Sequence, residues 1–198
     1  MALRKAPARA DRLVVGLGNP GAQYVRTRHN VGFLVLDELA RRYRFPKPAR
    51  AFEGRYSAGS IAGITVGLLA PHTYMNESGR SVAAALRGLG LVPADLLVVH
   101  DHIDLPFGRI RLAHDGGTGG HNGLKSLHEL IGAQFDRVRV GVDRPPTTNP
   151  DIVAAFVLSP FSESLDEVNR LIGEAADAVE AWLADGLQAA ADRFNRGG

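Results

Sequence analysis

The sequence predicts an α/β fold in which one compact domain holds a twisted, mixed β-sheet surrounded by helices. Short apolar runs typical of buried strands alternate with stretches of helical spacing, and two of the runs are joined as in a hairpin. The length of 198 residues is about that of one domain. With 45% hydrophobic and 22% charged residues, the composition is that of a globular protein and excludes fibrous and disordered classes.

The first strand and the first helix are predicted near the start of the chain. Residues 13–17 form an apolar run that ends in a turn at residues 19–21. Apolar residues with helical spacing follow over residues 30–43, and Pro46 ends this pattern. Residues 1–11 are expected to be a flexible N-terminal extension, and residues 12–198 the single domain.

A hairpin and a second helix are expected next. Strands at residues 52–58 and 64–69 are joined through residues 61–63, and residues 81–89 have helical spacing that Gly90 ends. The hairpin requires antiparallel neighbours, so the sheet is predicted to be mixed.

Polar side chains follow directly on the next strand. Residues 96–99 are all apolar and run into His100, Asp101 and His102. Open α/β sheets place their functional sites at the carboxyl ends of strands. These three side chains are therefore expected at such an edge.

The second half of the chain predicts two further strands and two further helices. Residues 109–112 and 137–142 are strands, the latter with an arginine face, and a glycine-rich loop at residues 116–120 leads into a helix. A capping box at residues 164–167 opens the last helix. The residues expected on buried helix faces are Leu124, Leu127 and Leu130 in the first helix, and Leu165, Val168, Ile172, Ala175, Val179 and Leu183 in the second, with Trp182 beside them.

Composition excludes several kinds of chemistry. The chain has no cysteine, which excludes disulfides, thiolate zinc sites, iron–sulfur clusters and a cysteine nucleophile. The net charge is only +2, and most basic residues are arginine, so an acidic partner is compatible with the composition but not required by it. Residues 56–76 lack charged side chains, but polar residues, Pro71 and glycines interrupt them, so no membrane-spanning helix is expected.

Two phosphate-binding motifs are incomplete. GLGNPG at residues 16–21 has the glycine spacing of a dinucleotide fingerprint but leads into a turn rather than a helix. Leu124 stands where a phosphate loop requires glycine before Lys125. The glycine loop still feeds a helix N-terminus, whose free N–H groups attract an anion. A long surface connection that needs glycine for its positive φ angles is an equally good interpretation. No serine-nucleophile motif is present.

A metal site is the third incomplete motif. His100, His102 and Asp104 resemble the ligand run of dinuclear zinc hydrolases, but Leu105 stands where that run has its last histidine. Hydrogen-bonded core histidines are the plainer interpretation. A metal-dependent hydrolase that uses these three residues is kept as an alternative.

Histidines, a carboxylate and neutral amides gather at the predicted strand ends and loop edges. A histidine activated by a carboxylate, with amides that orient substrate and water, is typical of a hydrolase that uses a general base and no metal. Each of these residues alone is typical of a turn, a cap or a surface, so the hypothesis depends on the set: Asn19, His29, Asn30, Asn76, Asp101, His121 and Asn122.

Several runs together resemble one family, the bacterial peptidyl-tRNA hydrolases. The resemblance covers roughly residues 12–190 in the order and spacing of that family. The runs are VVGLGNPG at 14–21 followed by Tyr24, TRHNVG at 27–32, YMNESG at 74–79, HD at 100–101, DLP at 104–106, GGHNGLKS at 119–126 and RVRVGV at 137–142.

This resemblance implies an esterase that cleaves the bond between a peptide and the 3′ ribose of tRNA. It implies a cytoplasmic monomer that has no cofactor and no obligate protein partner, and that binds the acceptor end and the peptide of peptidyl-tRNA. By position, His29 looks like the general base, Asp101 the carboxylate that orients it, and Asn19 the residue that recognises the peptide. The other residues implied to contact substrate are Tyr24 and Tyr74 as aromatic walls, Asn76 and Asn122 as positioners of substrate and water, Met75, His121, and Arg111 and Arg139 as the phosphate clamp.

Five positions depart from the pattern of the family. His102 stands in place of a usual glutamate, Ala113 in place of a lysine of the phosphate clamp, His114 and Asp115 in place of residues that are normally uncharged, and Asp143 in place of a glycine.

A relative that binds RNA without catalysis is a second alternative, because binding and chemistry use separable residues. The presence of His29, Asp101 and the three asparagines argues against it.

Overall fold

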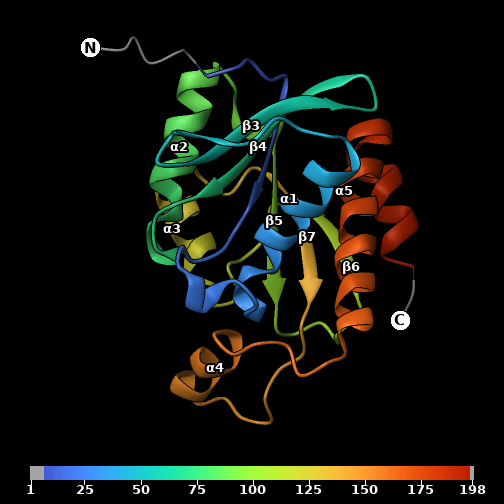
Figure 1. Cartoon of the computed structure of the whole chain (residues 1–198). Coiled ribbons are helices and arrows are strands. Elements are labelled where there is room, and N and C mark those ends of the chain that lie inside the picture. The colour runs from blue at the N-terminus through green and yellow to red at the C-terminus, as the bar shows by residue number, and fades with distance from the viewer. Residues whose placement is uncertain (1–6, 197–198) are drawn as a thin grey trace.

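A seven-stranded mixed β-sheet runs through the centre of the computed structural model, which describes residues 7–196 (Figure 1). The strand order is β2-β3-β4-β1-β5-β7-β6. The strands are β1 (Arg12–Gly16), β2 (Ala49–Ala51), β3 (Gly54–Ile61), β4 (Ile64–Pro71), β5 (Leu96–His102), β6 (Ile110–His114) and β7 (Asp136–Gly141).

The middle of the sheet is parallel and its two sides are antiparallel. β1 pairs in parallel with both β4 and β5, and β5 pairs in parallel with β7. β2, β3 and β6 add antiparallel pairs at the two sides. The carboxyl ends of β1, β4, β5 and β7 therefore lie at one edge of the sheet, and the predicted mixed α/β fold is confirmed.

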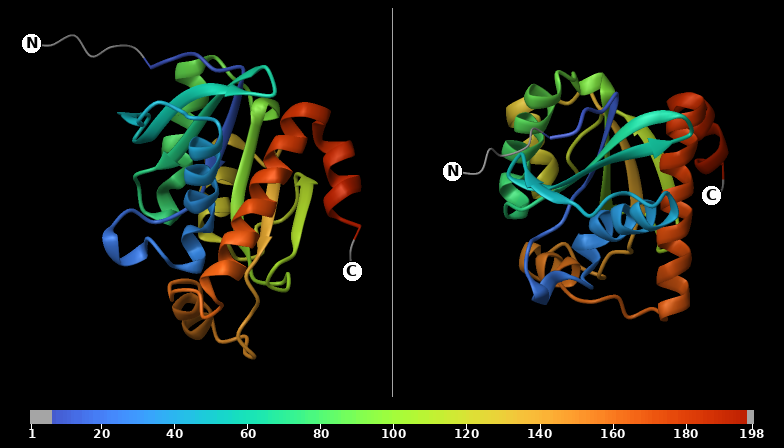
Figure 2. Two further views of the ribbon diagram at one scale, coloured as in Figure 1. Left: turned by 45° about the vertical axis from the view of Figure 1, so that its right-hand side comes forward. Right: turned by 45° about the horizontal axis from the view of Figure 1, so that its top comes forward.

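Helices cover both faces of the sheet (Figure 2). α1 and α5 pack on one face, and α2 and α3 on the other. α4 lies apart from both layers, past the ends of β5 and β7 (Figure 1). The helices are α1 (Val31–Arg42), α2 (Ser78–Leu89), α3 (Asn122–Ile131), α4 (Pro150–Val157) and α5 (Leu165–Phe194), with 3₁₀ turns η1 (Ala22–Tyr24), η2 (Arg28–Asn30), η3 (Met75–Glu77) and η4 (Pro93–Asp95).

Alternation along the central strands divides the core into two layers. In β1, Leu13 and Val15 pack toward α2 and α3, whereas Val14 packs toward α1 and α5. All three side chains are fully buried, which explains why β1 reads as a continuous apolar run rather than an alternating one.

Some predicted elements differ in extent from the structure. α2 begins at Ser78, three residues before its predicted start, because its first turn is built from small residues that pack closely on α3. The Gly79 amide donates to Ser126 Oγ at 3.0 Å. β2 and α4 were not predicted.

Two leucines predicted to be buried are exposed. Leu130 is 53% exposed because it lies about 120° around α3 from Leu124, whereas Ile131 returns to the buried face. Leu165 is 69% exposed because it occupies the first turn of α5, at the end of the sheet. Val168 is buried as predicted, Ile172, Ala175, Val179 and Leu183 belong to or pack against the core between α5 and the sheet, and Trp182 is buried beside them.

The last turn of α5 closes one edge of the sheet. The Asn195 side chain accepts from the Leu112 amide and donates to the Leu112 carbonyl of β6, both at 2.9 Å. Among the described residues, no helix combines the length and the apolar run that crossing a bilayer requires.

The predicted flexible extension is only partly described. Residues 1–6 lie outside the described residues. The Ala8 carbonyl accepts a hydrogen bond from the Tyr56 hydroxyl, and the Asp11 amide donates to the Thr65 carbonyl, both at 2.8 Å. The stretch from Ala8 to Asp11 is therefore attached to the sheet rather than free of it.

Two glycines bring the start of α1 against the end of β1. A methyl group on Gly32 would lie 2.6 Å from the carbonyl oxygens of both Leu17 and Val99, and one on Gly16 would overlap the Gly32 carbonyl. These contacts are to backbone atoms, which cannot turn away. The close approach holds the segment before α1 beside the end of β5.

We expect Gly32→Ala to destabilise the protein by about 3 kcal/mol, because overpacking against backbone forces the helix off the sheet. Gly173→Ala is the matched control, since the nearest atom to its added methyl group is an Arg42 side-chain nitrogen at 3.4 Å. Alanine at this helical position is expected to stabilise by about 0.5–1 kcal/mol. Urea unfolding measures both, and equal stabilities of the two variants would contradict the close approach.

Candidate active site

A cavity of about 890 Å³ opens beyond the carboxyl ends of β1, β4 and β5. Asn19 follows β1, the segment from Tyr74 to Asn76 follows β4, and Asp101 lies near the carboxyl end of β5. Neighbouring parallel strands thus deliver their following residues to the same place, as the sequence predicted.

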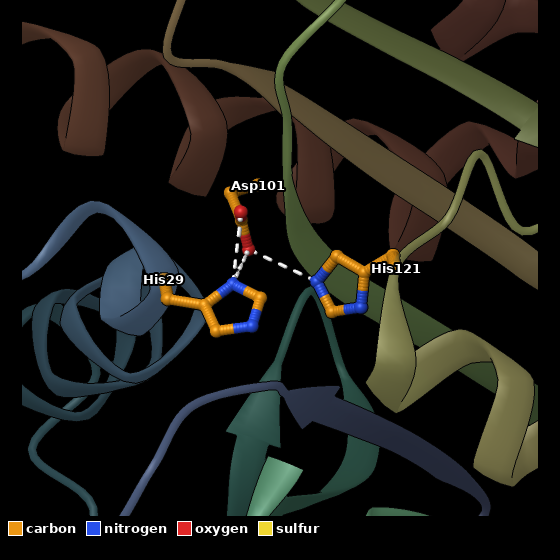
Figure 3. A group of neighbouring side chains, drawn as sticks. All are labelled: His29, Asp101 and His121. Atoms are coloured by element: carbon orange, nitrogen blue, oxygen red, sulfur yellow. Dashed lines mark hydrogen bonds and ion pairs between the residues drawn. The ribbon is translucent and has the colours of Figure 1, made fainter. Parts of the chain in front are cut away.

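A buried carboxylate joins two imidazoles in this cavity. His29 Nδ1 lies 2.9 Å from both oxygens of Asp101, and His121 Nε2 lies 3.0 Å from Asp101 Oδ1. The two imidazole rings lie next to each other, with their centres 4.8 Å apart, and each turns one nitrogen toward the carboxylate (Figure 3). Asp101 is 3% exposed, so these two contacts take the place of the hydrogen bonds that water would make to an exposed carboxylate.

The backbone sets the tautomer of His121. Its Nδ1 caps α3 by accepting hydrogen bonds from the amides of Gly123 at 3.1 Å and Leu124 at 3.4 Å. Because Nδ1 accepts, Nε2 carries the hydrogen and donates it to Asp101. Burial lowers the pKa of His121 more than Asp101 raises it, so this imidazole stays neutral.

His29 is held in the other tautomer. Its Nδ1 donates to Asp101, which leaves Nε2 as the nitrogen able to accept a proton. Burial opposes a charge on His29, but the charge and hydrogen bond of Asp101 outweigh it, so the pKa of His29 is raised above 6.5. Burial would raise the pKa of Asp101, yet the two histidines hold that pKa well below its usual range. The pair therefore suits a carboxylate that stabilises an imidazolium.

The asparagines after β1 form a fixed pair. Asn30 Oδ1 accepts from the Asn19 amide at 2.8 Å, and Asn30 Nδ2 donates to the Asn19 carbonyl at 2.9 Å. Asn19 Oδ1 in turn accepts from the Met75 amide at 2.9 Å. Its Nδ2 therefore remains to donate to a ligand, so Asn19 presents mainly a donor to the cavity.

The other predicted site residues divide into those that reach the cavity and those that do not. Tyr74 stands at its rim with 62% of its surface exposed. Tyr24 and Arg111 do not line it, although Arg111 lies opposite Arg139 across β6 and β7. The predicted residues that line the cavity beside Asn19, His29, Asp101 and Tyr74 are Met75, Asn76, His121, Asn122 and Arg139.

Arg137 lies on the same strand face as Arg139 but serves the fold. It is fully buried, and its guanidinium donates to the carbonyls of Gly117 and Gly116 at 2.9 and 2.8 Å. Burial lowers its pKa to about 10. This arginine fastens the glycine loop that precedes His121, and the sequence pattern did not separate its role from that of Arg139.

The structure does not assemble the alternative metal site. His100 Nδ1 lies 2.7 Å from the Asp101 carbonyl, and the Asp104 carboxylate pairs with Arg144 at 2.8 Å. Burial lowers the pKa of His100 well below 6.5. These groups are engaged in separate contacts, and the interpretation of core histidines fits His100.

Among the described residues, one group brings three possible ligand atoms within 4.8 Å of one another, namely His29, Asp101 and His121. This set fits a metal poorly, because His121 Nε2 carries a hydrogen while its Nδ1 caps α3. The donors are arranged to hold protons rather than a cation.

One part of the cavity lining was not predicted from the sequence. It consists of Val153, Ala154, Val157 and Leu158, from α4 and its end. Asn149 before Pro150 was the available signal, since Asn149 Oδ1 caps the helix by accepting from the Asp151 amide at 2.9 Å.

Comparison with known proteins decides the family. The sequence profile described as peptidyl-tRNA hydrolase matches residues 13–198. The chain belongs to this family. A peptidyl-tRNA hydrolase of Mycobacterium sp. (strain KMS) is 49% identical over 181 residues, which cover 90% of this chain and 93% of that protein. One from Geobacter sp. (strain M21) is 45% identical over 188 residues, covering 94% and 98%.

A solved structure of the family supports the fold. The crystal structure of peptidyl-tRNA hydrolase from Acinetobacter baumannii is 36% identical, superposes with a TM-score of 0.85, and covers 96% of this chain and 97% of its own. The resemblance drawn from the motifs is confirmed, together with the α/β fold that it implied.

Two departures from the family pattern have physical explanations. Asp143 has a φ of 63°, in the left-handed region that glycine favours and that aspartate tolerates. Burial and the charge of Arg139 lower the pKa of His102, so this histidine stays neutral rather than adding a positive charge beside Asp101. Ala113 lies opposite Arg137 in the β6–β7 pairing, away from the cavity lining.

We expect histidine titration by NMR to give His29 a pKa above 6.5, and Asp101→Asn to lower it below 6.5, because burial then acts without the opposing charge. His114 is the control, since Asp136, outside the cavity, raises its pKa. The His114 pKa should be the same in both proteins. If the pKa of His29 is the same in Asp101→Asn as in the unmodified protein, Asp101 does not control the protonation of His29.

Proposed function

We propose that this chain hydrolyses the ester bond between peptide and tRNA in peptidyl-tRNA, with His29 as general base on the attacking water. The observation that carries the proposal is the buried Asp101 that holds His29 Nδ1 at 2.9 Å and leaves Nε2 free, in a chain of the peptidyl-tRNA hydrolase family. The released tRNA can be charged again.

The reaction has two proton transfers. His29 Nε2 takes a proton from water as the water oxygen bonds to the ester carbonyl carbon. Asp101 stabilises the imidazolium that forms. The bond from that carbon to the ribose oxygen then breaks, and His29 returns the proton to the ribose oxygen. The products are a peptide acid and a tRNA with a free hydroxyl.

The amides select and place the substrate. Asn19 Nδ2 donates to a carbonyl of the peptide, and Asn76 and Asn122, which both line the cavity, orient the ester and the water. A free aminoacyl ammonium would place donors against the donor of Asn19. Tyr74 offers its exposed ring to the terminal base or to the peptide. This arrangement favours N-blocked over unblocked aminoacyl-tRNA.

Positive charge at the cavity mouth meets the tRNA backbone. Arg139 lines the cavity, and Arg111 extends its charge across the neighbouring strand. Lys125 at the start of α3 adds a third cation beside a helix N-terminus. We further propose that the protein acts as a monomer in the cytoplasm, where translation makes peptidyl-tRNA.

We expect His29→Ala to lower kcat by about 10²- to 10⁴-fold, and Asp101→Asn to lower it less. The double variant should be no slower than His29→Ala, because a carboxylate without its imidazole has little to support. Turnover of N-acetyl-aminoacyl-tRNA by purified protein measures all three. Normal turnover by His29→Ala, or full additivity, would contradict the assignment of base and orienter.

The pH dependence of kcat/KM has a predicted sign. His29 must be neutral to take a proton, so the rate should fall as pH decreases through the pKa of His29, which lies above 6.5. In Asp101→Asn the acid limb should move to lower pH while the maximum falls. An acid limb that moves to higher pH would exclude the proposed pairing.

Asn19→Asp tests the donor role of the Asn19 amide. The carboxylate keeps the acceptor for the Met75 amide but replaces the donor with a negative charge. We expect KM for N-acetyl-aminoacyl-tRNA to rise and the ratio of unblocked to blocked hydrolysis to increase, since the charge attracts the free ammonium. An unchanged ratio would place peptide recognition elsewhere.

A further inference from the structure

Arg28 is a buried arginine directly before the proposed base, and its guanidinium points away from the reaction. It is 3% exposed and lies in η2 beside His29. A charged side chain this deep requires several partners to replace its water. Among the described residues, all of the hydrogen-bond partners of this side chain belong to the connection between α4 and α5.

The guanidinium contacts four residues of that connection. One terminal nitrogen donates to Ser159 Oγ at 2.8 Å and to the Pro160 carbonyl at 2.6 Å. The other donates to Ser162 Oγ at 2.9 Å and lies 3.5 Å from a Glu163 oxygen. The fork of an arginine can hold all of these acceptors at once, whereas a lysine ammonium cannot.

Backbone and aromatic contacts strengthen the same junction. The Arg28 amide donates to the Ser159 carbonyl at 3.2 Å, and Thr27 forms an antiparallel bridge with Pro160. The guanidinium also lies 4.2 Å from the ring centre of Phe156 in α4 and 5.6 Å from that of Phe161. One side chain therefore holds both the end of α4 and the segment that follows it.

Apart from the junction with Arg28, α4 packs only weakly against the rest of the protein. Of its eight residues only Val157 is buried, and the helix lies apart from the two layers on the sheet (Figure 1). Yet Val153, Ala154 and Val157 form one wall of the cavity that His29 lines. The place of this wall relative to His29 depends on the junction at Arg28.

We propose that Arg28 is a positioning residue for the hydrolysis, which fixes the apolar α4 wall against the segment that carries His29 and so aligns the peptide end of the substrate. The wall is apolar, which suits peptide side chains rather than phosphate. This inference rests on the proposed role of His29. It assigns to Arg28 substrate alignment rather than proton transfer.

The test compares Arg28→Lys with Arg42→Lys. Arg42 is the matched control, because it also joins two segments through several acceptors, from α1 to Asp177 and Glu180 of α5, away from the α4 wall. For both variants kcat and KM are measured with N-acetyl-aminoacyl-tRNA across pH, together with thermal unfolding and hydrogen exchange at residues 150–163.

We expect Arg28→Lys to raise KM on the order of tenfold, with kcat and the pKa of the acid limb little changed, and to speed exchange at residues 150–163. Arg42→Lys should lower the unfolding temperature and leave KM and that exchange unchanged. If Arg28→Lys behaves like Arg42→Lys, Arg28 is merely structural and the proposal is wrong. A fall in kcat with a shifted acid limb would also overturn it, since Arg28 would then act on His29.

A second variant approaches the same junction from its other side. Ser159→Ala with Ser162→Ala removes two acceptors but keeps Arg28, and should move KM and exchange in the same direction by less. If Arg28→Lys fails to fold, an unchanged KM in this variant overturns the proposal. Failure of the proposed function has a different signature, namely no hydrolysis by the unmodified protein, and exchange at residues 150–163 reports on the junction independently of the reaction.

Discussion

The charge of Asp101 is the constraint on which the site depends. A carboxylate buried at the end of β5 requires hydrogen-bond donors, and two imidazole N–H groups supply them. Each contact fixes the tautomer of its imidazole, and the tautomer of His121 is fixed a second time because its Nδ1 accepts from the amides that begin α3. The base, its orienter and the start of α3 are therefore one unit, and removing either partner of a buried pair of this kind typically costs about 3–5 kcal/mol.

The sheet supplies the geometry that this unit needs. Because β1, β4 and β5 are adjacent and parallel, the residues that follow them meet at one edge. The contact between Gly16 and Gly32 brings the start of α1 to within backbone contact of β5. His29 thereby reaches Asp101 although 72 residues separate them in the sequence.

The sequence predicts those parts of the structure that are governed by local pattern. Apolar runs located the central strands, and the motifs located His29, Asp101 and the asparagines at one edge. The contact of His121 with Asp101 joins two segments on either side of a glycine loop. It could not be predicted from the spacing of apolar residues, because it depends on the path of that loop. α4 was missed because it is apolar on nearly every side and exposed, so it lacks the two-faced pattern of a packed helix. The burial of Arg28 was not predicted, because its side-chain partners follow α4 and lie 131 to 135 residues away in the sequence.

The side chain of Asn195 stands in for a strand on the outer side of β6, since it takes both the amide and the carbonyl of Leu112. An open strand edge is a template on which another chain can add a strand. The C-terminal turn therefore contributes to solubility as well as to packing. A chain that ended before Asn195 would leave those two backbone groups available for edge-to-edge association. Such a truncated protein would aggregate, although its active site would be intact.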